Sequence, residues 1–267
     1  MRDLHISFIG CGNMASAMIH GIIKAGKVAP DNVMASNRSR EKLEAIHASC
    51  DIRTTTDNCE AAAFADVLFL SVKPQFYEQV ICEIKDAIRP ECLIVSIAPG
   101  KTLAWLSSLL GADKKILRTM PNTPAMVGEG MMGICPNERM TEDDVHLLQD
   151  ICKSFSRTQV VGEHLMDVVT AVSGSSPAYV FLFIEAMADA AVAGGMTRSQ
   201  AYEFAAQSVL GSAKMVLETG KHPGELKDMV CSPAGTTIEA VRVLEDKGLR
   251  SAVFEAMMAC LDKSKGM

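Results

Sequence analysis

Short apolar runs alternate with helix-forming patterns over residues 5–161 and then stop. The first five runs are uniformly apolar, which is typical of parallel strands buried on both faces. They occupy residues 5–10, 33–37, 66–72, 92–98 and 115–120, and helical patterns occupy residues 13–25, 39–48, 75–88 and 102–110. A further strand, helix and strand are expected at residues 130–134, 141–155 and 158–161. This order predicts an α/β fold with a doubly wound, Rossmann-type parallel sheet.

Long helical patterns replace the alternation after Gly162. Leu165, Val168, Val169 and Val172 follow the spacing of one apolar helix face. Further helices are expected at residues 177–193, 197–218, 222–230, 232–248 and 249–263. We therefore predict two domains: residues 1–162, which bind a nucleotide, and residues 163–267, which are entirely helical.

Composition excludes several function classes. The formal net charge of −6 argues against a nucleic-acid partner. The nine cysteines form no C-x-x-C pair, so we expect reduced thiols, a cytoplasmic location and no metal site. We also expect no membrane span, because Glu185 and Asp189 soon follow the apolar segment 178–184.

The first chemical signal is the loop after the first expected strand. Gly10-Cys11-Gly12-Asn13-Met14-Ala15 has the G-x-G-x-x-A form of a dinucleotide-binding loop and precedes a helix. Gly10 permits the tight turn, Gly12 admits a pyrophosphate, and Ala15 lets the helix pack closely. The strand-loop-helix context therefore predicts dinucleotide binding.

The second expected strand indicates which dinucleotide binds. An NAD-specific site usually has an acidic residue there, whereas this chain has Asn37-Arg38-Ser39. These residues suit a 2′-phosphate, so we expect NADP(H) to be preferred and NAD(H) to remain possible. The alternative is a solvated turn in which Ser39 caps the next helix.

Two later strand ends, residues 71–75 and 96–100, should flank the reactive end of the cofactor, together with residues 120–124. Lys73 could be a general acid, a phosphate contact or a solvated lysine. No hydrolase or zinc motif is present.

A second signal lies in the helical half. Ser232 and Pro233 fit the N-cap and first position of a helix whose amides and hydroxyls, at Gly235, Thr236 and Thr237, would suit a small carboxylate. The alternative is a structural helix that is merely well capped. Two neighbouring candidates have structural explanations: His222 as a cap, and Glu163 as an acid near the positive end of a helix.

Together these motifs resemble the pyrroline-5-carboxylate reductase family over nearly the whole chain. The most specific match is residues 227–241, KDMVCSPAGTTIEAV, preceded by HPG at residues 222–224. Residues 9–15, 37–39, 72–75, 120–125 and 172–179 also resemble the family, in the expected order. Pro99 departs from the family's S-x-A-A-G loop and has no backbone N–H to donate.

The resemblance implies hydride transfer from the reduced nicotinamide of NAD(P)H to the C=N carbon of L-1-pyrroline-5-carboxylate, giving L-proline. It implies that Ser232, Gly235, Thr236 and Thr237 hold the substrate, with the Thr237 hydroxyl near the ring nitrogen and Glu163 beside the pocket. Thr237, Ser232 and Glu163 are the predicted catalytic residues. A cyclic imine can arrive already protonated, so orientation matters more than a strong proton donor.

The cofactor-binding residues implied in the same way come from several strand ends. They are Ile9, Gly10, Cys11, Gly12, Asn13, Met14, Asn37, Arg38, Ser39, Asn58, Val72, Lys73, Pro74, Ser96, Ile97, Ala98 and Asn122.

The family's helical domain interlocks with a second copy, so the resemblance implies a homodimer, possible larger assemblies, and substrate bound between one subunit's nucleotide domain and its partner's helices. Two alternatives remain open. One is another NADP-linked dehydrogenase, such as a β-hydroxyacid dehydrogenase, for which Lys214 is the best candidate proton donor. The other is an NADP-sensing or scaffold protein without turnover.

Overall fold

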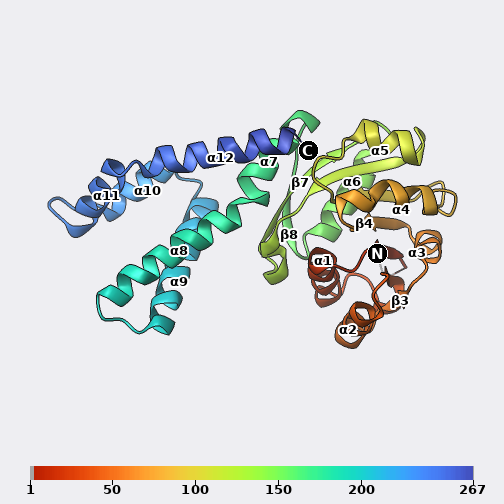
Figure 1. Cartoon of the computed structure of the whole chain (residues 1–267), viewed down its shortest axis with the longest axis horizontal. Helices are drawn as coiled ribbons and strands as arrows, with labels where there is room; N and C mark the ends of the chain where they lie inside the picture. Colours follow the sequence, from red (N-terminus) through yellow and green to blue (C-terminus); the bar gives the residue numbers. More distant parts are fainter. Residues whose placement is uncertain (1–2, 267) are drawn as a thin grey trace. The chain divides into compact units, whose positions relative to one another are not determined.

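The computed structural model describes residues 3–266, which form two compact units (Figure 1). The first unit contains the described residues up to Ser175 together with the C-terminal segment from Leu261. The second unit is Ser176–Cys260.

The first unit is built on the expected sheet. Its described strands are β1 (Ile6–Ile9), β2 (Val33–Ser36), β3 (Arg53–Thr55), β4 (Val67–Leu70), β5 (Leu93–Ser96), β6 (Lys115–Met120), β7 (Gly130–Pro136) and β8 (Ser156–Val160). Their order is β3-β2-β1-β4-β5-β6-β7-β8, and the neighbouring strands are parallel except β6 with β7. The predicted doubly wound fold is confirmed, with one antiparallel pair that the sequence pattern did not indicate.

Strand β3 and the helix after it were missed by the sequence analysis. β3 has three residues, Arg-Thr-Thr, at the edge of the sheet, and none is buried. A short polar edge strand has no apolar run to reveal it. The following helix, α3 (Asn58–Phe64), has Asp57 as its N-cap, and the Asp57 carboxylate accepts from the Cys59 and Glu60 amides.

Strand side chains alternate between two hydrophobic clusters, one on each face of the sheet. In β4, Val67 and Phe69 join one cluster, and Leu68 and Leu70 join the other. The first face is covered by α1 (Asn13–Lys24), α2 (Arg40–Cys50) and α6 (Glu142–Cys152). The second is covered by α3, α4 (Tyr77–Ile84) and α5 (Leu103–Leu110). The core therefore lies on both faces of the sheet, as in other doubly wound folds.

Strand register aligns the chain segments that carry the predicted site. Ile9 pairs with both Ser36 and Leu70, and Leu70 pairs with Ser96. The residues that follow these strand ends, including Gly10, Asn37 and Ser71, therefore emerge side by side at one edge of the sheet. Ligands of open α/β sheets bind at this carboxyl edge.

The first compact unit extends beyond the predicted domain boundary between residues 162 and 163. Secondary structure does change there, but residues up to 175 stay with the sheet. The reason is tertiary contact: Glu163 pairs with Arg118 of β6, and the Ser173 carbonyl accepts a hydrogen bond from Asn122. The C-terminal segment also belongs to this unit, since Ser264 Oγ donates to Asp167 Oδ1 at 2.8 Å.

The second unit contains α8 (Ser176–Ala193), α9 (Arg198–Thr219), α10 (Pro223–Val230), α11 (Thr236–Asp246) and most of α12 (Leu249–Lys265). Its buried cluster in the described chain is small: Ala188 of α8 with Ala201 and Ala205 of α9. Phe181, Phe204 and Phe254 are 62%, 66% and 68% exposed. By itself, this unit therefore leaves large apolar side chains uncovered.

One helical stretch, Glu163–Ala193, is long and apolar enough to cross a membrane by length and composition. Core helices of soluble proteins meet the same criterion.

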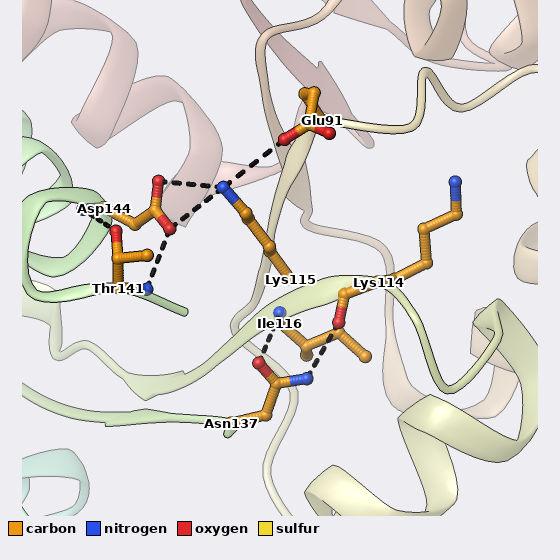
Figure 2. Close-up of polar contacts among 7 residues, drawn as sticks. All are labelled: Glu91, Lys114, Lys115, Ile116, Asn137, Thr141 and Asp144. Atoms are coloured by element: carbon orange, nitrogen blue, oxygen red, sulfur yellow. Dashed lines mark hydrogen bonds and ion pairs between the residues drawn. The ribbon is translucent and has the colours of Figure 1, made fainter. Parts of the chain in front are cut away.

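A polar network fixes the amino end of β6 (Figure 2). Lys115 Nζ lies 3.1 Å from Asp144 Oδ2 and 3.5 Å from Glu91 Oε2. Asp144 and Thr141 form a reciprocal capping box at the start of α6. Asn137 bridges two backbone groups, accepting from Ile116 N at 3.2 Å and donating to Lys114 O at 2.8 Å.

This network predicts acid sensitivity at Asp144. Burial alone would raise the pKa of the Asp144 carboxyl, but hydrogen bonds from Thr141 and the Lys115 ammonium outweigh it and lower that pKa. As the pH falls, the Asp144 carboxyl is protonated in the unfolded chain before it is protonated in the folded one. Its contribution to the free energy of unfolding is therefore present above about pH 4 and is lost as the pH falls through the lowered pKa of the folded state. Asp144→Asn should reduce the free energy of unfolding at neutral pH and flatten its decline in acid, measured by urea denaturation across pH.

The exposed neighbour Asp143 provides the control for this measurement. Asp143→Asn should leave the decline in acid unchanged. Identical acid profiles for wild type and Asp144→Asn would contradict a stabilising role for the Asp144 carboxylate.

Candidate cofactor and substrate sites

The predicted phosphate loop has the backbone that its sequence requires. Gly10 adopts φ +95°, a left-handed conformation that favours glycine, and its amide donates to Ser36 O at 2.9 Å. Gly12 caps α1 in an extended conformation, with no side chain capping that helix. A Cβ at Gly12 would meet no atom within 4 Å. The first turn of α1 therefore offers backbone amides beside open space, as an anion requires.

A cavity of about 200 Å³ adjoins this loop. It is lined by eight of the predicted cofactor residues: Gly10, Cys11, Gly12, Asn37, Arg38, Asn58, Val72 and Lys73. Ser71, from the strand end 71–75 that was expected to flank the cofactor, also lines it, as do Lys42, Phe76 and Val80, which sequence reasoning did not assign. The sequence did offer a signal for Lys42, because it is a cation in the first turn of α2, close to Arg38 in the chain.

The donor set of this cavity fits a phosphorylated dinucleotide. Arg38, Lys42 and Lys73 line it, and its described lining contains no Asp or Glu. The Arg38 guanidinium lies 4.7 Å from the centre of the Phe76 ring, a cation–π contact that orients it. Ser71 Oγ is buried and has no hydrogen-bond partner in the described residues. The cationic lining and this orphaned hydroxyl suit an anionic ligand rich in acceptors.

Other predicted cofactor residues lie outside this cavity. Ile9 is buried in β1, Asn13 and Met14 begin α1, Ser39 is the N-cap of α2, and Pro74 opens a short 3₁₀ turn. Ser39 makes no side-chain capping bond. Within the cavity, both polar atoms of the Asn58 carboxamide have partners. Its Oδ1 accepts from Ser36 Oγ at 2.8 Å, and its Nδ2 donates to Glu83 Oε2 at 3.1 Å.

Tyr77, which the sequence analysis did not single out, holds the loop after β5. Its hydroxyl donates to Leu70 O and accepts from Ile97 N at 3.2 Å, beside Ser96 Oγ. Burial raises the pKa of Tyr77 to about 12, so the hydroxyl stays neutral. Tyr77 thus fixes the predicted contacts Ser96, Ile97 and Ala98 against β4.

Glu163 is the predicted substrate residue that lies in the first unit. Its Oε1 accepts from Leu103 N at 2.6 Å and from Arg118 Nη1 at 2.9 Å. Arg118 is 5% exposed. Glu163 therefore caps α5 and neutralises a buried cation, rather than complementing only the helix that it begins. It also lines a cavity of about 710 Å³, but none of the other predicted site residues lines that cavity.

The remaining predicted substrate residues lie at the start of α11, and here the expected helix start is wrong. The helix begins at Thr236 with Gly235 as N-cap, whereas Ser232 and Pro233 lie in a preceding turn. Gly235 N donates to Ser232 O at 3.1 Å, and Ala234 adopts φ +57°. This left-handed residue stops a helix from starting at Ser232.

The correction brings the two threonines to the helix terminus. Thr236 and Thr237 are its first two residues, and no side chain in the described structure caps this end. The three amides of residues 236–238, which have no intrahelical partners, and two hydroxyls therefore gather at the positive end of α11. His222, by contrast, caps α10 by accepting from Gly224 N at 3.0 Å, as its structural explanation predicted.

Two family models match the chain. One, described as pyrroline-5-carboxylate reductase dimerisation, matches residues 163–267. The other, described as NADP oxidoreductase coenzyme F420-dependent, matches residues 5–100. The pyrroline-5-carboxylate reductase of Escherichia coli strain K12 is 53% identical over 97% of both chains.

The chain belongs to the pyrroline-5-carboxylate reductase family. Solved structures of family members agree. The protein from Coxiella burnetii has a TM-score of 0.92 and 37% identity, covering 99% of this chain and 98% of its own. The Plasmodium falciparum protein, solved with NADP bound, has a TM-score of 0.90 and 32% identity, covering 100% and 98%.

This membership makes the chain an oxidoreductase whose nucleotide-binding half belongs to an NADP-dependent group. The phosphate loop lies in the segment matched by the NADP oxidoreductase model, and Glu163 and the α11 terminus lie in the segment matched by the reductase model. The alternative proton donor Lys214 is exposed and lies 3.5 Å from Glu218, one helical turn away. Its exposed setting gives no support to a dehydrogenase of the other class.

Proposed function

We propose that this chain reduces the C=N bond of L-1-pyrroline-5-carboxylate to L-proline, with NADPH preferred over NADH. The observation that carries the proposal is the uncapped start of α11, where Thr236 and Thr237 supply amides and hydroxyls to a small carboxylate. The cationic lining of the cavity at the phosphate loop supports the cofactor preference.

The residues of the chain have binding and orienting roles in this reaction. The α11 terminus, with Ser232 and Gly235, would hold the substrate carboxylate, and the Thr237 hydroxyl would orient the ring nitrogen. Arg38, Lys42 and the α1 terminus would hold the cofactor phosphates. NADPH supplies the hydride when bound. Because the imine can enter protonated, these residues need to align the reactants more than to transfer a proton.

The test is oxidation of NADPH by the purified chain with DL-pyrroline-5-carboxylate, with proline measured as product. A panel of 2-keto and 3-keto acids serves as the comparison. Proline formed in step with NADPH loss is the expected result. Turnover of a keto acid in place of the imine would overturn the proposal, and cofactor binding without turnover on any substrate would favour a sensor.

The cofactor preference predicts an asymmetric effect at Arg38. Arg38→Ala should weaken NADPH binding about 10- to 100-fold, because a charge-assisted contact to the 2′-phosphate is lost, and should change NADH binding little. Binding titrations with both cofactors make the measurement. Arg40→Ala is the matched control, since Arg40 is exposed near the same turn but does not line the cavity. Equal losses for both cofactors would remove Arg38 from this role.

We further propose a homodimer assembled through the second unit. Helices α8, α9 and α12 leave Phe181, Phe204 and Phe254 exposed, as a protein–protein interface would, and the matched family model is a dimerisation model. A membrane could cover α8 instead, which makes membrane association the competing outcome.

Light scattering should give at least twice the 28.7 kDa chain mass without detergent. Phe181→Asp should shift the protein toward monomer, because it places a charge in the proposed interface. Val127→Asp is the control, since Val127 is also apolar and exposed but lies in the first unit. A wild-type monomer, or a chain that sediments with membranes, would contradict the dimer. A mass above two chains would reveal larger assemblies.

The nine cysteines support a reducing, cytoplasmic location. Cys11, Cys50, Cys92, Cys135 and Cys152 are buried and form no disulfide. Burial raises the pKa of Cys92 and Cys152 to about 12 each, so these thiols stay protonated and unreactive.

A further inference from the structure

A single π-helical turn, Thr170–Gly174, follows α7 (Met166–Val169). Ser175 N donates to Thr170 O at 2.9 Å, the five-residue spacing of a π-helix. Two hydroxyls of the turn bond back to the chain: Thr170 Oγ1 to Met166 O and Ser173 Oγ to Val169 O, each at 3.0 Å. Isolated π turns are rare and occur often at functional sites, because they re-aim a helix at the expense of regular hydrogen bonds.

Asn122 ties this turn to the sheet. Its Nδ2 donates to Ser173 O at 3.0 Å, and its Oδ1 accepts from Met131 N at 2.8 Å. The residue is 8% exposed, and both bonds are part-buried. The turn also packs closely here, since a Cβ on Gly174 would lie 2.6 Å from Met120 Cε.

The attachment point lies on the edge of the sheet where the cofactor is proposed to bind. Ser96 pairs with Arg118, so the carboxyl end of β6 continues the edge formed by β1, β4 and β5. Arg38 and Lys42, proposed to bind phosphate, lie at the β2 side of that edge. A dinucleotide bound along the edge therefore directs its reactive end toward the β5 and β6 ends.

We propose that Asn122 is a positioning residue, whose carboxamide fixes the π-helical turn at the reactive end of the cofactor site and thereby sets the rate of imine reduction. It acts through the Ser173 carbonyl and not by holding the cofactor. The proposal rests on the proposed reductase function. A displacement of about 1 Å in a reacting geometry can cost about 100-fold in rate, which gives the scale of the effect.

Asn122→Asp tests this role with little change in shape. The new carboxylate still accepts from Met131 N, but it cannot donate to the Ser173 carbonyl and repels it. The matched control is Asn137→Asp, because Asn137 bridges two backbone groups in the same way at the amino end of β6 (Figure 2). Both variants should lower the melting temperature, since each loses one part-buried hydrogen bond.

Kinetics should then separate the two variants. We expect Asn122→Asp to lower kcat with pyrroline-5-carboxylate about 100-fold, with the Kd for NADPH within about twofold of wild type. Asn137→Asp should keep both values within about twofold. As the pH falls toward about 4, the introduced carboxyl becomes a donor, so the kcat of Asn122→Asp relative to wild type should rise.

Hydrogen exchange gives a readout that does not depend on turnover. Amides of residues 173–176 should exchange faster than wild type in Asn122→Asp and at the wild-type rate in Asn137→Asp. If Asn122→Asp fails to fold, Asn122→Ser replaces it, because the shorter side chain also loses the bond to the Ser173 carbonyl.

Three outcomes would overturn the role. An equal kcat for the two asparagine variants makes Asn122 merely structural, and loss of NADPH affinity in proportion to kcat makes it a cofactor contact. Unchanged exchange at residues 173–176 removes the link to the π turn. A wild-type chain that binds NADPH but does not reduce the imine instead overturns the proposed function, and the role with it.

Discussion

Replacing Gly10 with alanine should destabilise the first unit and abolish measurable NADPH binding. The new Cβ would lie 2.8 Å from the carbonyl carbon and oxygen of Ser71, at φ +95°. Backbone strain and overpacking together should cost about 3 kcal/mol, or roughly 6–12 °C in Tm for a unit of this size. Thermal unfolding and a cofactor titration measure the two effects.

Gly12→Ala separates folding from binding in the same loop. Its Cβ would meet no atom within 4 Å, and Gly12 has no left-handed backbone, so Tm should change little. The Cβ would nevertheless occupy the space where the pyrophosphate is proposed to approach, so the Kd for NADPH should rise more than about tenfold. Unchanged binding in Gly12→Ala, or unchanged Tm in Gly10→Ala, would contradict this division of roles.

Glu163→Ala should give the second large effect. The substitution removes the acceptor of Leu103 N and leaves the Arg118 guanidinium buried and unpaired. Breaking a buried pair costs about 3–5 kcal/mol, and because Glu163 is partly exposed we expect about 3 kcal/mol here. Urea denaturation gives the free energy of unfolding directly. The KM for the imine, measured where the variant is folded, should also rise if Glu163 lies beside the substrate as proposed.

Two controls define the origin of that loss. Glu138→Ala changes an exposed carboxylate that lines the same cavity, and it should leave stability unchanged. Arg118→Met combined with Glu163→Gln should recover part of the loss, since an apolar group then replaces the buried charge. A double variant no more stable than Glu163→Ala would show that the unpaired guanidinium is not the cause.

Short-range sequence patterns predicted the structure correctly where residues close in sequence are also in contact in the fold. The apolar runs form strands in the structure, and the dinucleotide-binding loop after β1 forms a left-handed turn at Gly10 followed by α1. The same local reasoning misplaced the start of α11. Ser232-Pro233 has the composition of a helix start, but Ala234 adopts a left-handed conformation that residue type alone does not indicate.

The site contacts that sequence reasoning missed join residues far apart in the chain. Glu163 meets Arg118 across 45 residues, Asn122 meets Ser173 across 51, and Tyr77 meets Ile97 across 20. No spacing rule connects such pairs, because strand order brings them together. Lys42 is intermediate, since its charge was visible but its place in the cavity depends on how α2 packs beside the loop.

By itself, the sequence determined the doubly wound fold, the dinucleotide loop, the cationic turn after β2 and the family resemblance, because periodicity and turn chemistry act over a few residues. The tertiary structure alone decided that Glu163 neutralises Arg118, that Tyr77 and Asn122 hold the edge of the sheet, and that the α11 terminus is uncapped. The physical reason is that buried polar groups must find partners wherever packing places them, and packing is a property of the whole fold.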